Sequence, residues 1–320
     1  MNEIYRKLRP RDFDQVVGQD RAVKVLEGFL KKGEVPHAIL FTGPSGCGKT
    51  TLARILGMKL GCCDKDTLLG LSNRICNFEE INAAESRGID TVRDIKQRMG
   101  LSAFGGGKRA WVLDEVHKLT GDAQTALLKI LEDPPDHVWF FLCTTDPAKL
   151  LKTIHTRCTE IRLGALPQDK IVKLLIDSIG RVKPEFESTG NVIEKIAESA
   201  DGSARKALVL LQQVMGLEGE EAQLDAVEKA DSRKQAIDLC RLMMKSGAKW
   251  DEIRWVIEKI DEEPETVRRI ILGYASSVLL HGGKMSSKAA AILGTFRDHW
   301  YDCGRAGLVM SCWEVFGQKE

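Results

Sequence analysis

The octapeptide Gly43–Thr50, GPSGCGKT, constrains this chain most strongly, because it fits G-x-x-x-x-G-K-[ST], the phosphate-binding loop. It follows the apolar run Ala38–Phe41, which predicts a short buried strand, and it precedes Thr51–Leu56, which predicts a helix start. In that context the glycines let backbone N–H groups close around phosphate oxygens, and the helix N-terminus adds partial positive charge. We therefore expect nucleoside triphosphate binding. The alternative is a chance glycine-rich turn.

Two residues of this loop have further expected roles. Lys49 can reach the outer phosphates, where it would assist catalysis, and Thr50 can ligate a magnesium ion. The nucleotide contacts predicted from this segment are Gly43, Pro44, Ser45, Gly46, Cys47, Gly48, Lys49, Thr50 and Thr51.

Two adjacent carboxylates, Asp114 and Glu115, follow a second apolar run at residues 110–113. Asp114 can hold magnesium through its water shell, and Glu115 can orient and polarise an attacking water. The alternative is a strand end followed by an acidic helix cap. The phosphate loop earlier in the chain favours the catalytic interpretation.

Strand-like and helix-like segments alternate over the first part of the chain. The helical pattern of Ala123–Leu131 is one example, and the order predicts an α/β domain with a parallel sheet. Nucleotide binds beyond the carboxyl ends of such strands. The predicted strands are Ala38–Phe41, Phe78–Ile81, Ala110–Leu113, Trp139–Cys143 and Glu160–Leu163.

The strand signals end after Leu163. Amphipathic helices are predicted at residues 167–178, 191–199 and 203–215, and a turn-rich acidic stretch at 216–221 indicates a boundary. Another helix begins at Pro264 and places Val267, Ile270, Ile271, Tyr274 and Val278 on one face. We expect an α/β P-loop ATPase domain over residues 1–163, a small helical lid over 164–220 and an all-α domain over 221–320.

The composition excludes some classes of protein. Lysine and arginine number 47 against 46 acidic residues, which argues against a protein that coats nucleic acid with its whole surface but not against a local basic strip. No apolar stretch approaches a membrane span, and the N-terminus does not resemble a signal peptide, so a cytoplasmic location is expected. The nine cysteines form no C-x-x-C pair, which favours free buried thiols over a zinc site at Cys62, Cys63 and Cys76.

Asp114–Leu119, DEVHKL, resembles the DEVH box of bacterial clamp-loader ATPases, the gamma/tau subunits of DNA polymerase III. Five other segments also resemble motifs of that family in the family's order, and the amino-terminal one is shared with replication factor C. The amino-terminal signature corresponds to Tyr5–Pro10, Phe13–Asp14 and Val16–Gln19. The other matches are residues 126–135, Thr144–Pro147, Thr156–Cys158 and Gly202–Leu208, so the resemblance reaches about Gln213.

The resemblance implies an AAA+ ATPase of bacterial or phage origin that uses ATP and Mg²⁺. It implies that Thr145 senses the γ-phosphate, that Arg157 acts as an arginine finger on a neighbouring subunit's nucleotide, and that Arg205 contacts its own. The alternative for Thr145 is an ordinary strand-end threonine, that for Arg157 is a surface salt bridge, and that for Arg205 is a helix-surface arginine. Tyr5, Arg6 and Pro10 are implied to lie near the adenine, with packing as the alternative for Tyr5.

The same resemblance implies partners. A finger supplied to a neighbour requires an oligomer, and the family's C-terminal helices form a collar of five subunits. Several copies of this chain, a different subunit, a sliding clamp and primer–template DNA are therefore expected, and no membrane. The candidates for contact with DNA are Arg87, Arg93 and Lys129, and the alternative for each is a solvated helix charge. The candidates for contact with the clamp are Met99, Leu101 and Phe104, and the alternative for these is core packing.

The chain also departs from the family. The four-cysteine zinc module of cellular relatives is lost or degenerate, so no zinc is expected, and Thr156 replaces the serine of the SRC motif. Lys206 stands where the second sensor usually has aspartate. Two other classes stay open: a helicase-type AAA+ motor, such as a Holliday-junction branch migration subunit, and a structural clamp-loader subunit that does not hydrolyse ATP. The DEVH and SRC-like motifs argue against the first, and intact Lys49 and Glu115 against the second.

Overall fold

A computed structural model describes residues 4–63, 77–103, 105, 107–186, 188–245, 247–260, 263–283, 285–298 and 303–316, with the side chains of 229 and 231–234 excepted. The chain divides into two compact units, Met1–Met215 and Gly216–Glu320. The predicted division into three domains stays a prediction.

Five parallel strands form the sheet of the first unit, in the order β2-β3-β4-β1-β5. All five predicted strands are confirmed to within one residue at each end, which confirms the α/β fold class. The strands are β1 (Ala38–Thr42), β2 (Phe78–Asn82), β3 (Arg109–Asp114), β4 (Val138–Thr144) and β5 (Thr159–Arg162).

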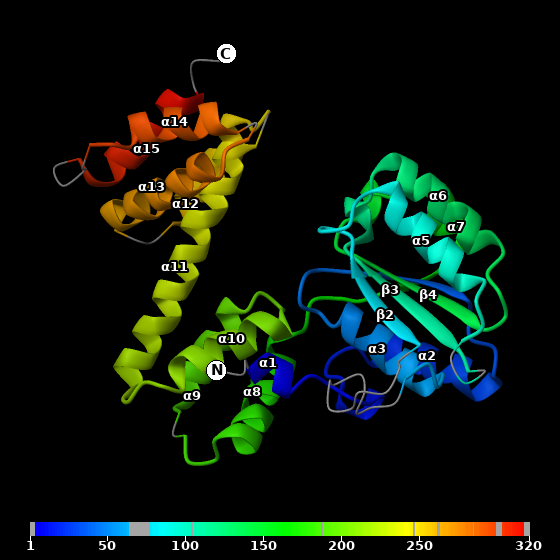
Figure 1. Cartoon of the computed structure of the whole chain (residues 1–320). Coiled ribbons are helices and arrows are strands. Elements are labelled where there is room, and N and C mark those ends of the chain that lie inside the picture. The colour runs from blue at the N-terminus through cyan, green and yellow to red at the C-terminus, as the bar shows by residue number, and fades with distance from the viewer. Residues whose placement is uncertain are drawn as a thin grey trace. The chain divides into compact units, whose positions relative to one another are not determined.

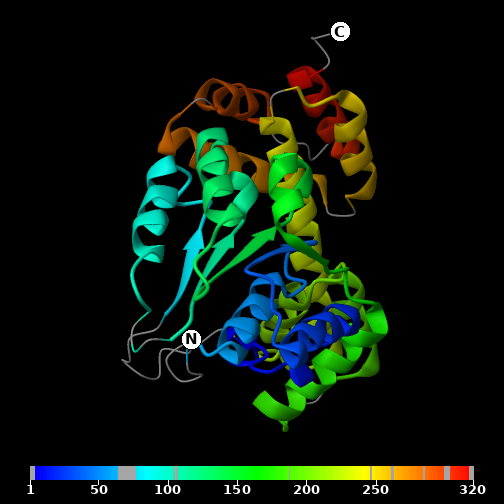
Figure 2. The ribbon, with the colours of Figure 1, turned by 90° about the vertical axis from the view of Figure 1, so that its right-hand side faces the viewer.

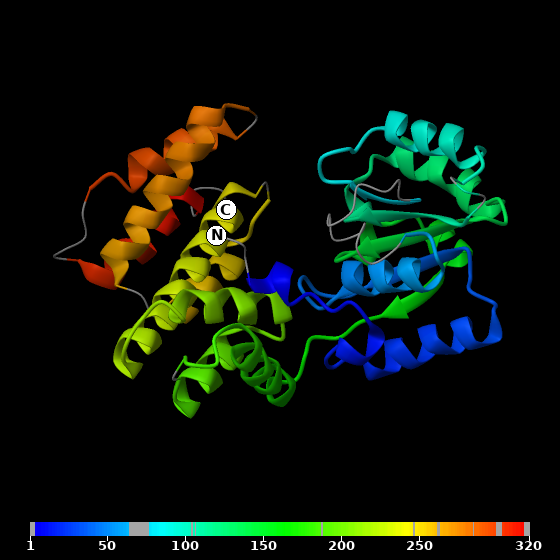
Figure 3. The ribbon, with the colours of Figure 1, turned by 60° about the horizontal axis from the view of Figure 1, so that its bottom comes forward.

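Helices cover both faces of this sheet (Figure 1), and the layers are also visible in Figure 2 and Figure 3. One face carries α2 (Asp20–Lys32) and α3 (Lys49–Lys59). The other carries α5 (Ile89–Met99), α6 (Gly121–Glu132) and α7 (Lys152–Arg157). Short 3₁₀ turns lie at η1 (Phe13–Gln15), η3 (Val116–Lys118) and η4 (Pro147–Lys149).

The buried side chains of the central strands alternate between two cores. Phe41 and Phe141 pack with α2 and α3, whereas Leu40 and Phe140 pack beneath α5 and α6. Because both faces are covered, the central strands are continuous apolar runs rather than alternating ones. This explains why apolar runs located the three central strands, β1, β3 and β4, in the sequence.

A helical bundle follows the sheet: α8 (Gln168–Val182), α9 (Gly190–Ser199) and α10 (Ala204–Val214). The short α1 (Ile4–Lys7) packs against α10, and the backbone N–H of Ile4 donates to Gln212 Oε1 at 2.8 Å. The N-terminal segment is thereby anchored on the helices that the sequence predicts to be a lid.

The start of α10 touches the chain that leaves the sheet. The N–H of Leu166 donates to the carbonyl of Gly202 at 2.9 Å. Gly202 has a φ of +74°, and a Cβ there would lie 2.5 Å from the Cβ of Ala165. Only glycine fits this close approach without a shift of the backbone.

The second unit consists of helices packed on one core, as its sequence predicts. Val267 and Ile271 are buried in this core, and Ile270, Tyr274 and Val278 pack against it, which confirms the predicted face of the helix from Pro264. The elements are α11 (Glu220–Met244), α12 (Trp250–Lys259), α13 (Pro264–His281), α14 (Ser286–Thr295) and α15 (Gly304–Phe316).

Two general features concern the described residues alone. None of their helices is both long and apolar enough to cross a membrane. Their cysteines include seven free thiols, but Cys63 is disulfide-bonded, so the expectation of free thiols throughout is wrong there. Disulfide pairing depends on which side chains the fold brings together, and spacing alone does not reveal it. Cys76, named with Cys62 and Cys63, lies outside the described residues.

Candidate active site

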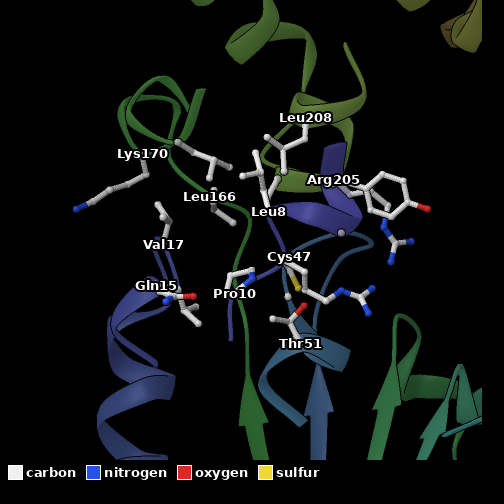
Figure 4. Close-up of a pocket in the computed structure, with 18 of the residues that line it drawn as sticks. Leu8, Pro10, Gln15, Val17, Cys47, Thr51, Leu166, Lys170, Arg205 and Leu208 are labelled. Carbon is white, nitrogen blue, oxygen red and sulfur yellow. The ribbon is translucent and has the colours of Figure 1, made fainter. Parts of the chain in front are cut away.

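A cavity of about 360 Å³ lies beside the phosphate loop, the N-terminal segment and the start of α10. Figure 4 shows Cys47 and Thr51 on one side of this cavity and Arg205 with Leu208 on the other. Of the predicted contacts that the structure describes, those in the lining are Tyr5, Pro10, Ser45, Gly46, Cys47, Gly48, Lys49, Thr50, Thr51 and Arg205, with Asp114 and Glu115. Arg6, Gly43, Pro44 and Thr145 lie outside the described lining.

The phosphate loop is packed against α10. Gly46 has a φ of +75°, and a Cβ there would lie 2.2 Å from Ser203 Oγ. Ser203 caps α10, because its hydroxyl accepts from the N–H of Lys206 at 3.3 Å. A side chain at position 46 would therefore push the loop and the start of α10 apart.

The Lys49 ammonium lies within the phosphate loop. The residue is 6% exposed, and Nζ donates to the carbonyl oxygens of Gly43 and Pro44 at 2.8 Å each. These two bonds hold the positive charge at the centre of the loop, which suits contact with the outer phosphates of a bound nucleotide.

The two predicted magnesium ligands are in direct contact. Thr50 Oγ1, at the start of α3, donates to Asp114 Oδ2 at 3.0 Å. Asp114 Oδ1 accepts from the N–H of Glu115, also at 3.0 Å. Mg²⁺ prefers oxygen ligands and is usually bound through one or two carboxylates together with water and phosphate. The residues present therefore fit this ion.

Glu115 is held in an unusual backbone conformation. Its φ is +52°, which is uncommon for a residue with a side chain and tends to occur at functional sites. Its Oε2 accepts from Thr145 Oγ1 at 2.9 Å and lies 3.3 Å from His117 Nδ1. The strand ends of β3 and β4 thus bring Glu115 and Thr145 together, although 30 residues separate them.

His117 is a site residue to which the sequence assigned no role. Its side chain is 6% exposed, and Nδ1 lies 3.0 Å from Thr144 Oγ1. Burial is the main cause that lowers the pKa of His117, partly opposed by the nearby Glu115 carboxylate. Burial therefore favours the neutral form of the imidazole. Its position in the DEVH segment, two residues after Glu115, was the one feature of the sequence that could have indicated a role in the site.

Gln19 ends the amino-terminal signature, which predicted no role for it. It is 6% exposed, and Nε2 donates to the carbonyls of Cys47 at 3.3 Å and Gly164 at 2.8 Å. The N–H of Gly164 donates back to Gln19 Oε1 at 3.4 Å. One buried amide thus connects the phosphate loop to the segment between the sheet and α8.

Two arginines lie near the ring of Tyr5. The Arg205 guanidinium is 5.8 Å from the centre of the Tyr5 ring and that of Arg6 is 5.9 Å from it. Arg6 Nε also donates to Tyr5 Oη at 3.3 Å. Arg9 lines the cavity as well. The family resemblance predicted nucleotide contacts for Arg6 and Pro10 but not for Arg9.

Arg157 does not reach the cavity of its own chain. Its Nε donates to Glu132 Oε1 at 2.8 Å, and Nη1 donates to the carbonyl of Thr153 at 3.0 Å. The surface ion pair that the sequence left as an alternative is therefore present in this chain. A role on a neighbouring subunit stays a prediction.

The DNA candidates are exposed on or beside α5 and α6, which pack together. Arg87 Nε donates to the carbonyl of Ala84 at 2.9 Å, Arg93 pairs with Asp90, and Lys129 lies on α6. Of the clamp candidates, Leu101 is 61% exposed and Met99 packs against the core. Phe104 lies outside the described residues. The DNA and clamp assignments stay predictions.

The sheet order, the phosphate loop and the paired carboxylates at the end of β3 define an AAA+ P-loop ATPase. A solved structure of the Thermotoga maritima RuvB Holliday junction branch migration motor has a TM-score of 0.56 at 21% identity, covering 78% of this chain and 85% of that one. A family model, DNA polymerase III, delta subunit, matches residues 18–167. The DNA polymerase III gamma subunit of Buchnera aphidicola subsp. Acyrthosiphon pisum is 31% identical over 279 residues, or 78% of this chain and 76% of that subunit. The chain belongs to the DNA polymerase III gamma/tau family, and the resemblance to clamp-loader ATPases is confirmed.

Other relatives are matched over a smaller share of their length. The Bacillus subtilis tau subunit is 35% identical over 68% of this chain, and the Escherichia coli tau subunit is 35% identical over 66%. The chain spans 40% and 34% of those two relatives. The likeness to RuvB, at 21% identity, shows the fold alone.

Proposed function

We propose that this chain is the ATP-hydrolysing subunit of a sliding-clamp loader, which opens a ring-shaped clamp and places it on primer–template DNA. The observation that carries the proposal is the contact of Thr50 with Asp114 beside a Glu115 held by Thr145. This is the set of groups that would hold Mg²⁺ and orient the attacking water within one subunit of a member of the gamma/tau family. A subunit with a purely structural role has no use for such a set.

The chemistry follows from the positions of these groups. The loop N–H groups and Lys49 would bind the phosphates, and Mg²⁺ held by Thr50 and Asp114 would offset their negative charge. Glu115 would orient and polarise the attacking water. Thr145 would position Glu115 in the absence of nucleotide and would donate its single O–H to the γ-phosphate when ATP is bound. Arg205 would couple the position of the lid to the nucleotide.

The oligomer would complete the site. Arg157 would leave Glu132 and stabilise the charge that develops on a neighbour's nucleotide. The all-α region from about residue 221 would form the collar that holds several copies of this chain with a different subunit. ATP binding would assemble a spiral that holds the clamp open, and hydrolysis on primed DNA would release the clamp. Clamp loading by this chain would take place in the cytoplasm.

Steady-state ATP hydrolysis by the full chain tests this proposal. It is measured alone, with primed DNA, and with DNA plus the clamp of the same source. The expected result is stimulation by DNA and clamp together, lost in Arg157→Ala and retained in Arg162→Ala, an exposed control arginine on β5. ATPase activity that ignores DNA and clamp, even with co-purified partner subunits, would contradict it. Unwinding of branched DNA without a clamp would favour a helicase-type motor instead.

A further inference from the structure

We propose that Arg9 is a second arginine, besides Arg205, that binds the phosphates of the nucleotide within the same subunit. The inference rests on the nucleotide site proposed above and adds a binding residue to it. Arg9 lines the cavity together with Cys47, Thr51 and Arg205. It therefore shares the cavity with residues of the phosphate loop and the first turn of α3.

The Arg9 guanidinium makes no hydrogen bond or ion pair with any other described residue. The carboxylate whose charge acts on it, Glu80, is already bound on both oxygens by Arg54. Arg54 thus occupies the carboxylate whose charge acts on Arg9. A guanidinium that is partly removed from water and lacks an anionic partner is unfavourable unless a ligand supplies one.

The charges near Arg9 point to an anionic ligand. Burial is the largest cause that lowers the pKa of Arg9, and the positive charges of Arg54 and Arg205 lower it further, whereas Glu80 and Tyr5 raise it. An anion between Arg9 and Arg205 would reverse the repulsion between them. In a cavity built on a phosphate loop, the anion of matching chemistry is a nucleotide polyphosphate. A planar guanidinium binds phosphate oxygens in a bidentate manner.

A role in packing against the base predicts a different result. If Arg9 only contacted the adenine or supported Tyr5, its loss would weaken adenosine and ATP binding equally. If it binds the phosphates, its loss would weaken ATP and ADP but not adenosine. The series adenosine, ADP and ATP therefore separates the two roles.

The experiment measures the Kd of each nucleotide by calorimetry with Mg²⁺, for the full chain and for Arg9→Ala, Arg9→Lys and Arg11→Ala. Arg11 is an exposed neighbour outside the described lining, so Arg11→Ala is the matched control. We expect Arg9→Ala to weaken ATP binding about ten- to hundredfold, which is typical for a hydrogen bond between charged groups. Arg9→Lys should show a smaller loss, and adenosine binding should be unchanged.

Each other outcome overturns the inference in an identifiable way. Unchanged ATP binding in Arg9→Ala, or an equal loss for adenosine and ATP, refutes the phosphate role while the nucleotide site stands. Failure of the unmodified chain to bind ATP refutes the nucleotide site itself, and the role of Arg9 with it. If Arg9→Ala does not fold, Arg9→Lys decides, because it keeps the charge and loses only the bidentate geometry.

Discussion

The close packing around Gly202 allows a quantitative prediction of how an alanine there would change the free energy of unfolding. Gly202 and Gly33 have nearly the same left-handed backbone, with φ of +74° and +72°. A Cβ at Gly33 meets nothing within 4 Å, whereas a Cβ at Gly202 would lie 2.5 Å from Ala165 Cβ and 3.1 Å from the backbone N of Leu166. Alanine at Gly33 therefore tests backbone strain alone, and alanine at Gly202 tests the same strain plus a steric clash.

The two costs can be estimated separately. A left-handed conformation costs a residue with a Cβ about 1–2 kcal/mol, so Gly33→Ala should destabilise the first unit by about that amount. The clash at Gly202 is with backbone and with a Cβ, neither of which can rotate away. Overpacking of this kind adds about 1–3 kcal/mol, for a total of about 2–5 kcal/mol in Gly202→Ala.

The assay is urea-induced unfolding of both variants, followed by circular dichroism, together with the Kd for ATP. Gly202→Ala should be the less stable variant, and it should also bind ATP more weakly, because Arg205 lies three residues further along the same turn. Gly33→Ala should bind ATP normally. Equal free energies of unfolding in the two variants would refute the argument that the contact with Ala165 and Leu166 constrains this position.

Four further tests address the site and the second unit. Glu115→Gln should lower kcat about a hundredfold or more while ATP still binds, and a parallel loss of ATP binding in calorimetry would count against a catalytic role. Mixing Arg157→Ala with Glu115→Gln chains should restore ATPase activity above either alone if Arg157 acts across subunits, and no recovery would argue for a role within its own chain. Because burial lowers the pKa of His117, the unfolded chain binds the proton more readily than the folded chain. The free energy of unfolding should therefore fall as the pH is lowered from about 7 to about 5, and it should fall less steeply in His117→Gln. The same pH dependence of urea unfolding in both proteins would refute this. Arg268→Met should destabilise the second unit by about 3–5 kcal/mol, because the buried Glu265 loses a bidentate partner, and adding Glu265→Gln should recover part of that loss in urea unfolding.

Much of the fold could be predicted because its signals are local. Each central strand of the covered sheet is an apolar run, such as Val138–Thr144, in which every residue is buried. The amphipathic face that begins at Pro264 likewise needs only helical periodicity. The strand order β2-β3-β4-β1-β5 did not follow from these runs, because pairing depends on crossovers between segments distant in the chain.

The candidate site divides in the same way. Lys49 and Thr50 belong to one contiguous loop, so their chemistry is evident from the motif alone. The contact of Thr145 with Glu115 depends on β3 and β4 lying side by side with matching register. No role could be predicted for His117 or Gln19 from the sequence, because the function of a polar residue becomes evident only when its partners are known.

The sequence by itself determined that this chain carries a phosphate loop, an acidic strand end and an α/β core followed by helices, because each depends on residues close together in the chain. The tertiary structure decided which distant side chains meet. It paired Arg157 with Glu132, joined Gln19 to both Cys47 and Gly164, and left Arg9 in the cavity while Arg54 bound Glu80. The physical reason is that charge pairing and burial depend on distance in space, and packing sets that distance independently of separation along the sequence.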